Sequence, residues 1–189
     1  TCGERVIELS IADEMNVSQN TARDALRILE QECWVVKKAR KGVYVRMFDA
    51  DDAAEIYILR ATLEKLVLHW WIDGDNDAHT LNDCLDTAQQ HIALNNQHGA
   101  LEALYRIHTT LAQVAAKPQT AAILQGIHNQ CRLLHNLREA RRVDSPIRFE
   151  GYETLLTTLN RRDYARATAT LDSILLQERR DILTAIDLG

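Results

Sequence analysis

The sequence predicts a mainly α-helical protein, with a short mixed unit at the N-terminus and an all-α remainder. Three observations lead to this prediction. The 189 residues include only two prolines and seven glycines, so few points interrupt a helix. From residue 53 onward, apolar residues recur at the three- and four-residue spacings of helices. Between residues 34 and 47, in contrast, β-branched and aromatic residues lie on both sides of a basic turn.

Composition is that of an ordinary globular protein, with 46% hydrophobic and 26% charged residues. No apolar run approaches the roughly 20 residues that span a bilayer, so we expect no membrane partner. The four cysteines are scattered without a CxxC pair, which indicates neither a zinc site nor a disulfide framework. We therefore expect reduced thiols in a cytoplasmic protein, with Cys131 as a small core residue. The chain starts at Thr1 without a methionine or a secretory signal, so we expect its natural N-terminus to lie upstream.

Charge is unevenly distributed along the chain, whose net charge is −5. Residues 1–47 hold eight Lys and Arg against seven Asp and Glu, whereas residues 48–189 hold fourteen against twenty. Within residues 23–46 the balance is seven basic against three acidic residues. A locally basic segment on an acidic body is typical of a nucleic-acid-binding head on a larger partner domain, although a solvated basic face would look the same.

Two helices are predicted within the first 32 residues. Residues 8–15, "ELSIADEM", form the first, and "NVS" is a turn. Ser18 is a good N-cap for the second, because its hydroxyl can accept a hydrogen bond from the free backbone N–H near Thr21. One face of this second helix is apolar and is expected to be buried, with Ala22, Ala25, Leu26 and Leu29. The opposite face carries Gln19, Asn20, Arg23 and Arg27.

A two-stranded basic hairpin is predicted next, in "WVVKKARKGVYVRM". The β-branched pair Val35 and Val36 precedes the basic turn "ARKG", and residues 43–45 follow it. Helix, turn, helix and hairpin is the order of a winged helix-turn-helix. The first helix of such a domain is expected to precede Thr1.

The segment "FDADD" ends this unit, so we predict two domains, residues 1–47 and residues 48–189. Asp51 or Asp52 is the expected cap of the next helix. The all-α remainder is predicted to hold helices at 53–73, 78–95, 99–116, 119–141, 146–160 and 163–186, with breaks that include "VDSP" at residues 143–146. Along the first of these, a seam fit to pack on a neighbouring helix is formed by Ile56, Leu59, Leu63, Leu66 and Trp70.

These residues resemble a known family. "CGERVIELSIADEMNVSQNTARDALRILEQECWVVKKARKGVYV" resembles the winged helix-turn-helix of GntR-type bacterial transcriptional regulators. The remainder, opened by "DDAAEIYILRATLE", is similar to the ligand-sensing and dimerising domain of the FadR subgroup, called FCD. The resemblance implies a homodimer that binds a double-stranded DNA operator and a small-molecule effector, and that acts as a repressor or an activator.

In such regulators the helix that begins at Ser18 enters the major groove. The resemblance implies phosphate and base-edge contacts by Ser18, Gln19, Asn20, Thr21, Arg23 and Arg27, with Lys41 and Gly42 at the wing tip. Two positions depart from the family. Gln19 stands where the family usually has arginine, so a DNA contact is lost or altered. Cys33 stands where the family commonly has a helix-ending glycine, so the residue must adopt the left-handed conformation at some cost or the helix must end differently.

Many FCD domains hold a divalent metal with one Asp and three His side chains. Here His108 is kept, but the other three positions hold Leu104, Tyr152 and Ile174. Leucine and isoleucine cannot coordinate a metal. We therefore predict no family-type metal site and no cofactor, with His108 as a polar wall residue of the effector pocket.

Three polar residues flank an apolar stripe on the predicted helix 119–141. The stripe consists of Ile123, Leu124, Ile127, Cys131 and Leu134. His128, Arg132 and His135 lie one step around the helix, where they either border a cavity or face solvent. Arg106 and Tyr152 are further pocket candidates. Without a metal, the expected effector is a sugar acid or other small organic acid, and an acyl thioester is the alternative.

Three classes of function are compatible with the sequence. The leading one is a homodimeric transcription factor whose effector changes its affinity for the operator. The second is an enzyme, which we do not expect because we find no ligand set, activated nucleophile, phosphate loop or paired carboxylates. The third is a ligand-binding dimeric module with weakened or lost DNA binding, which Gln19 and Cys33 suggest.

Overall fold

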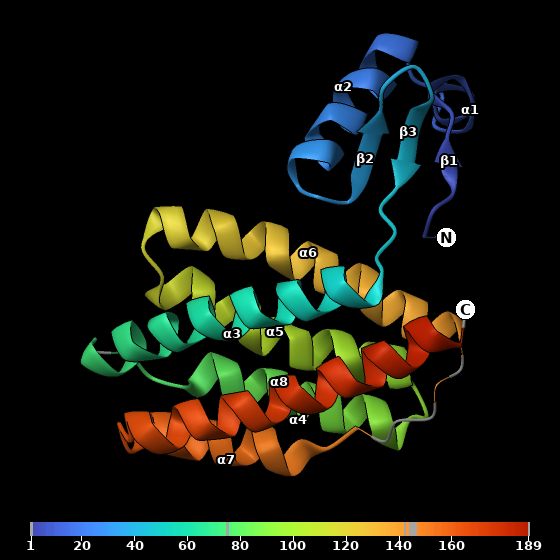
Figure 1. Ribbon diagram of the computed structural model, residues 1–189. Helices are drawn as coiled ribbons and strands as arrows, with labels where there is room; N and C mark the ends of the chain where they lie inside the picture. Colours follow the sequence, from blue (N-terminus) through green and yellow to red (C-terminus); the bar gives the residue numbers. More distant parts are fainter. Residues whose placement is uncertain (1, 75, 142, 144–146, 189) are drawn as a thin grey trace. The chain divides into compact units, whose positions relative to one another are not determined.

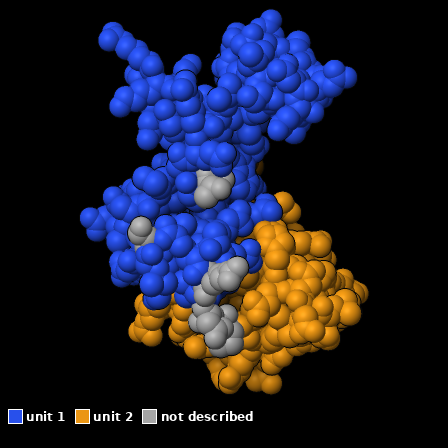
Figure 2. Space-filling view, turned by 90° about the vertical axis from the view of Figure 1, so that its right-hand side faces the viewer, with its two compact units in different colours: residues 1–56, 125–143, 182–189 blue, residues 57–124, 144–181 orange. Residues whose placement is uncertain are grey.

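A computed structural model describes residues 2–74, 76–141, 143 and 147–188. The chain divides into two compact units, coloured separately in Figure 2. Unit 1 consists of residues 1–56, 125–143 and 182–189, and unit 2 consists of residues 57–124 and 144–181. Three helices contribute residues to both units. The predicted domain boundary after residue 47 stays a prediction.

Residues 2–47 form a small α/β head within unit 1. It contains the helices α1 (Glu8–Glu14) and α2 (Gln19–Gln31) and a three-stranded antiparallel sheet. The strands are β1 (Arg5–Val6), β2 (Val35–Lys38) and β3 (Gly42–Val45), with β3 in the middle (Figure 1). The predicted two-stranded hairpin was therefore incomplete. β1 escaped prediction because two residues are too few to show an alternating pattern.

Helix α2 begins as predicted but buries a narrower face. The Ser18 hydroxyl accepts a hydrogen bond from the Thr21 backbone N–H at 3.1 Å. Ala22 and Leu26 are buried, whereas Ala25 and Leu29 are exposed, contrary to prediction. Helix α2 packs against α1 and β2, and this contact buries only Ala22 and Leu26 among the described residues of the helix.

At the C-terminal end of α2 the backbone adopts the left-handed conformation expected of the helix-ending glycine that the family commonly has. Cys33 has φ +66°, which is the left-handed region that disfavours side chains. Its backbone N–H donates to the Glu30 carbonyl, and the Trp34 N–H donates to the Leu29 carbonyl. The cysteine thus ends the helix by accepting the left-handed conformation, which is one of the two outcomes that we considered.

Helix α3 (Ala50–Asp73) begins with a reciprocal capping arrangement. The Asp52 N–H donates to Asp49 Oδ1 at 2.8 Å, and the Asp49 N–H donates to Asp52 Oδ2 at 3.2 Å. The cap is therefore Asp49, one turn before the residues that we expected.

The remaining described elements are helices, as predicted. They are α4 (His79–Ala93), α5 (Gln97–Ala115), α6 (Pro118–Ala140), α7 (Phe149–Asn160) and α8 (Tyr164–Asp187). Their ends differ from the predicted ends by three residues or fewer. Asp144, Ser145 and Pro146 of the predicted break "VDSP" lie outside the described residues. No helix in the described part of the chain is long and apolar enough to cross a membrane.

The buried face of α3 in unit 2 is not the predicted apolar seam. Its buried residues are Tyr57, Arg60, Glu64, Val67, Leu68 and Trp71. Within the predicted seam, Ile56 is buried, Leu63 and Trp70 are half-buried, and Leu59 and Leu66 are 45% and 37% exposed. In unit 2 the helix therefore buries a stripe that contains two charged residues, and the apolar seam stays partly exposed.

Candidate DNA-binding surface and effector site

The exposed face of α2 carries two arginines, which differ in how far neighbouring side chains hold them in place. Arg23 is held across the head, with Nε and Nη2 at 3.1 and 3.0 Å from Glu8 Oε2. Its Nη1 also donates to Asn20 Oδ1 at 3.4 Å. Among the described residues, Arg27 forms an ion pair with Asp24 alone, at 3.6 Å, and both side chains are 72% exposed. Arg23 is therefore oriented by its neighbours, whereas Arg27 is available to a ligand.

The first turn of α2 carries further polar groups. Ser18 Oγ lies 2.8 Å from Thr21 Oγ1, so the two hydroxyls form one small cluster at the start of the helix. Gln19 is the first residue of the helix and is exposed. A helix N-terminus with hydroxyls and free N–H groups suits phosphate oxygens.

The wing between β2 and β3 is basic and tightly turned. Its backbone adopts positive φ at Arg40 (+60°) and at Gly42 (+106°). The Lys41 N–H donates to the Lys38 carbonyl at 3.0 Å, and the Tyr44 hydroxyl donates to the Lys41 carbonyl at 3.3 Å. Gly42 is needed for its conformation, and a Cβ there would also lie 3.4 Å from the Arg5 guanidinium.

The wing has basic side chains that we did not select from the sequence. Arg40 and Lys38 lie in or beside the turn, and Arg5 reaches it from β1. The run "KKARKG" contained the signal for the first two. The approach of Arg5 depends on β1, whose pairing with β3 the sequence did not show.

The head contacts the part of α6 that belongs to the same unit. Asn129 Nδ2 donates to the main-chain carbonyl of Glu32 at 2.8 Å. A Cβ at Gly126 would lie 3.3 Å from Cys33 Sγ, so the helix and the end of α2 lie close together. The Arg132 guanidinium lies 5.6 Å from the centre of the Trp34 ring, a cation–π contact.

These contacts locate three of the predicted effector residues. Arg132 lies over Trp34, His128 is buried and His135 is half-buried, all within unit 1. The solvent-facing alternative is therefore wrong for His128. Ile123, which we placed in the buried stripe of this helix, is 58% exposed, whereas Cys131 is buried as predicted. Arg106 is exposed on α5 in unit 2.

His108 and Tyr152 meet in unit 2 inside a closed cycle of polar groups, all of which are buried except the half-buried Glu178. Arg60 Nε donates to Glu64 Oε1 at 2.8 Å, and Glu64 Oε2 lies 2.7 Å from His108 Nδ1. His108 Nε2 lies 3.2 Å from the Tyr152 hydroxyl, which donates to Glu178 Oε1 at 3.1 Å. Glu178 Oε2 accepts from Arg60 Nη1 at 2.7 Å and closes the cycle.

The cycle joins α3, α5, α7 and α8 through hydrogen bonds in the interior. Arg60 and His108 are 0% and 1% exposed. Arg60 lies between the carboxylates of Glu64 and Glu178, at 2.8 and 2.7 Å. This pairing of opposite charges offsets part of the cost of removing the groups from water.

Tyr152 stays protonated in this environment. Its pKa lies well above the ordinary 10.0, because burial disfavours the phenolate and because the Glu178 carboxylate lies beside it. The hydroxyl therefore acts as a hydrogen-bond donor and acceptor, and not as an anionic ligand.

The side chains around His108 do not fit the metal site of one Asp and three His that many FCD domains have. His108 points Nε2 at the Tyr152 hydroxyl, and Leu104 adds no donor beside it. Ile174 is half-buried against Gly151, where a Cβ would lie 3.0 Å from its Cγ1. Among the described residues, no three His, Cys, Asp or Glu side chains form a group that could hold a metal ion.

Three members of this cycle were not predicted as site residues from the sequence. Arg60 and Glu64 were noted only as part of a motif, and Glu178 was not selected. A signal existed for the first two, because they lie four residues apart on one helix face. Only the fold brings Glu178 to them.

The sequence matches two families that together cover most of the chain. Residues 1–45 match the bacterial regulatory proteins of the gntR family, and residues 55–177 match the FCD domain. The chain is 25% identical over 166 residues to YdhC of Bacillus subtilis strain 168, an uncharacterised helix-turn-helix-type transcriptional regulator, covering 80% of this chain and 74% of YdhC. It is 36% identical over 63 residues to the Nta operon transcriptional regulator of Aminobacter aminovorans, covering 33% and 30% of the two chains.

Solved structures share the fold. A protein of Rhodococcus sp. RHA1, described as a candidate GntR transcriptional regulator, superposes with a TM-score of 0.80 at 26% identity, covering 97% of this chain and 88% of its own. McbR/YncC of Escherichia coli superposes with a TM-score of 0.82 at 18% identity, covering 97% and 89%. The second likeness, at that identity, shows the fold alone.

Proposed function

We propose, from the premise that the chain belongs to the GntR family of bacterial regulatory proteins and carries an FCD domain, that a small-molecule effector controls its affinity for a DNA operator. The protein is a transcriptional regulator with an FCD effector-binding domain.

The proposal that the chain binds DNA rests on one observation. The exposed polar face of α2 and the basic wing belong to the same small head. The face carries Ser18, Gln19, Asn20, Thr21, Arg23 and Arg27, and the wing carries Lys41 and Gly42. A helix of this kind fits the major groove, where Arg27 can pair with guanine and the hydroxyls can contact phosphates. Lys41 and Arg40 would contact the backbone beside it.

The test is binding of the full chain to a palindromic site upstream of its own operon, followed by fluorescence anisotropy at several salt concentrations. Arg27→Gln is expected to weaken binding and to relax sequence preference, whereas Lys41→Gln is expected to weaken binding to all sequences and to reduce the salt dependence. Arg141→Gln is the matched control, because Arg141 is an exposed arginine just after α6 and outside the head. Binding that ignores both salt and sequence would contradict the proposal.

The effector that we propose is a sugar acid or other small organic acid, held without a metal at His108 and Tyr152. These two groups, with Arg60 beside them, provide hydrogen-bond donors inside the helical unit. The His108–Tyr152 contact of 3.2 Å is longer than the ion-pair contacts of the cycle, so a ligand hydroxyl or carboxylate can exchange with it at the lowest cost. Arg106, His128, Arg132 and His135 are secondary candidates.

The effector would act through helices that contribute to both units. Residues of α3, α6 and α8 lie in unit 1 and in unit 2, so a ligand that shifts these helices changes the surroundings of the head. A thermal-shift screen of sugar acids and organic acids, with and without a chelator, tests the proposal. A melting temperature that falls on adding chelator would contradict metal-free binding. If a compound raises the melting temperature of Tyr152→Phe as much as that of the native chain, its binding site does not include the Tyr152 hydroxyl.

The dimer that we propose forms through the outward seam of α3. Leu59 and Leu66 are exposed there, and the half-buried Leu63 and Trp70 continue the seam at spacings of four and three. Leu59→Glu with Leu66→Glu is expected to give a monomer in light scattering after size-exclusion chromatography. Ile123→Glu, on another exposed apolar residue, is the control and should leave the dimer intact. A dimer that survives both seam substitutions would contradict this interface.

A DNA-binding defect is the second candidate, because Gln19 replaces an arginine that such regulators usually have. In that case the protein would bind its effector and dimerise without recognising an operator. The anisotropy experiment separates the two candidates, because the defective module would show no specific site at any salt concentration.

A further inference from the structure

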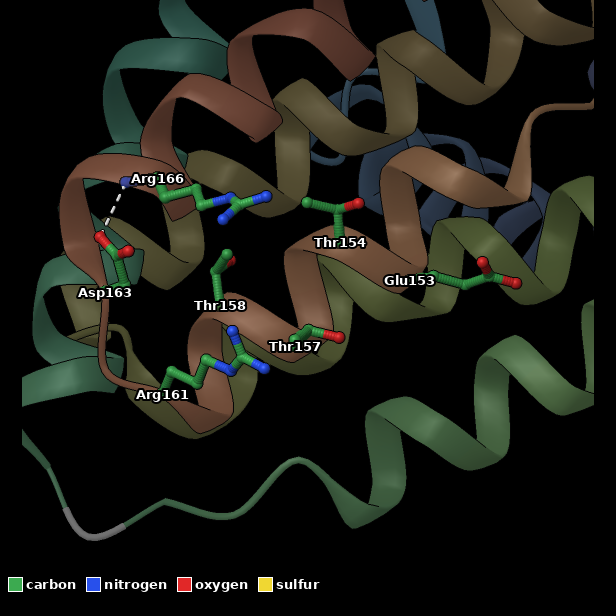
Figure 3. Close-up of a pocket in the computed structure, with 7 residues that line it drawn as sticks. All are labelled: Glu153, Thr154, Thr157, Thr158, Arg161, Asp163 and Arg166. Atoms are coloured by element: carbon green, nitrogen blue, oxygen red, sulfur yellow. Dashed lines mark hydrogen bonds between the residues drawn. The ribbon is translucent and has the colours of Figure 1, made fainter.

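A hollow on unit 2 collects hydrogen-bond donors that the proposed function does not use. It lies where the C-terminal half of α7 meets the first turn of α8, and it encloses a volume of about 180 Å³. Arg161 and Arg166 line it with three threonines of α7, as Figure 3 shows. In this view the two arginine side chains lie on either side of Thr158.

The two arginines are not occupied by carboxylates. Within the described ranges, neither guanidinium has an ion-pair partner within 4.0 Å. Two like charges beside one hollow raise its positive potential, and an anion that enters the hollow relieves their repulsion. Arginine also offers a fork of N–H groups that matches oxyanions in pairs.

The threonines differ in what they can donate. The Thr158 hydroxyl donates to the Leu155 carbonyl at 2.8 Å, so its hydrogen is engaged. The hydroxyls of Thr154 and Thr157 have no such bond within the described part of the chain and lie beside the arginines in Figure 3. The available donors therefore come from two helices and from several directions around the hollow.

The two acidic residues at the rim are engaged elsewhere. Glu153 accepts a hydrogen bond from Gln89 Nε2 at 3.1 Å, and its carboxylate extends away from the arginines in Figure 3. Asp163 Oδ1 accepts from the backbone N–H of Arg166 at 3.1 Å and so caps α8. Asp163 nevertheless leaves a negative charge at the edge of the hollow.

We propose that this hollow binds a small tetrahedral oxyanion, namely inorganic phosphate or the phosphoryl group of a small metabolite. Donors that surround the hollow from several sides suit the four oxygens of a phosphate better than the two coplanar oxygens of a carboxylate. The site is separate from the buried cycle, so it would bind its ligand independently of an organic-acid effector.

Isothermal titration of the full chain with inorganic phosphate, at constant ionic strength, tests the proposal. Arg161→Gln and Arg166→Gln are each expected to weaken binding roughly tenfold, because each removes a charged hydrogen-bond donor. Arg141→Gln, an exposed arginine outside the hollow, should bind phosphate like the native chain. Asp163→Asn should bind more tightly, because an asparagine still caps α8 but carries no charge.

Three outcomes would overturn the site. They are native-like phosphate binding by Arg161→Gln and Arg166→Gln, an equal loss in Arg141→Gln, and tighter binding of malonate than of phosphate. Far-UV circular dichroism verifies that each variant folds. If either glutamine variant fails to fold, Arg161→Met or Arg166→Met replaces it, and native-like phosphate affinity in that variant would also overturn the site. Operator binding plays no part in this experiment, so its result is independent of the proposed function.

Discussion

The Tyr152 hydroxyl lies 3.2 Å from His108 Nε2, so one nitrogen of this buried imidazole faces a phenol. The same hydroxyl donates a hydrogen bond to Glu178 Oε1 at 3.1 Å. Tyr152 therefore completes the polar cycle and links α5, α7 and α8 inside unit 2.

Tyr152→Phe is expected to lower the free energy of unfolding at pH 8 by about 1–3 kcal/mol, because His108 and Glu178 each lose a buried partner. The raised pKa of Tyr152 makes this difference pH-dependent. Its contribution is complete below the pKa of an unfolded tyrosine, near 10, and is lost as the pH rises through the folded value. Urea unfolding at pH 8 and pH 10.5 measures the difference. If the difference in free energy of unfolding between Tyr152→Phe and the native protein is larger at pH 10.5 than at pH 8, Tyr152 is not a buried, protonated phenol.

Arg60→Met is expected to destabilise the chain by about 3–5 kcal/mol, because it leaves Glu64 and Glu178 without their shared cation in the interior. Lys65→Met is the matched control, since Lys65 forms a 2.7 Å ion pair with Asp172 at the surface. The control should lose less than about 1 kcal/mol. Urea unfolding of both variants tests the contrast, and equal losses would show that burial does not decide the cost.

Gln19→Arg is expected to tighten operator binding by about tenfold, because an arginine at the start of α2 can pair with a guanine or a phosphate. Gln31→Arg adds the same charge at the exposed far end of the helix. Anisotropy titrations on operator and scrambled DNA separate the two variants. An equal gain in both would indicate simple charge attraction and not a contact made by position 19.

Cys33→Gly is expected to stabilise the chain by up to about 1 kcal/mol, because glycine adopts φ +66° without the clash of a side chain. Asn95→Gly is the control, because asparagine tolerates its φ of +56° better than other residues do. Its gain should be smaller. Thermal unfolding at one pH compares the two. A loss of stability in Cys33→Gly would show that the contact of Sγ near Gly126 outweighs the backbone strain.

The helices could be predicted almost entirely from the sequence, because apolar spacing and caps are local properties. The face that α3 buries could not, whereas four of the five residues predicted for the buried stripe of α6 are buried. α3 has an apolar stripe and a stripe with Arg60 and Glu64, and hydropathy favours burying the first. The second is buried because Glu178, His108 and Tyr152 come from distant positions to satisfy it. Long-range pairing of charges leaves no periodic signal in a sequence.

The candidate site could likewise be predicted from the sequence only in part. His108 and Tyr152 were selected from the sequence, and the fold places them 3.2 Å apart. Arg132 was selected for its charge but lies over Trp34, an aromatic residue 98 positions earlier in the chain. The hollow with Arg161 and Arg166 was not foreseen, since it exists only where two consecutive helices meet.

The hydrogen bond from Asn129 reaches the main-chain oxygen of Glu32, which a residue of any type would offer. Substitution at position 32 therefore leaves this attachment of the head chemically unchanged. The residues that face outward on α2, from Ser18 to Arg27, take no part in it. Residues on this outward face can therefore be exchanged one at a time while the head keeps the same hydrogen bond to α6.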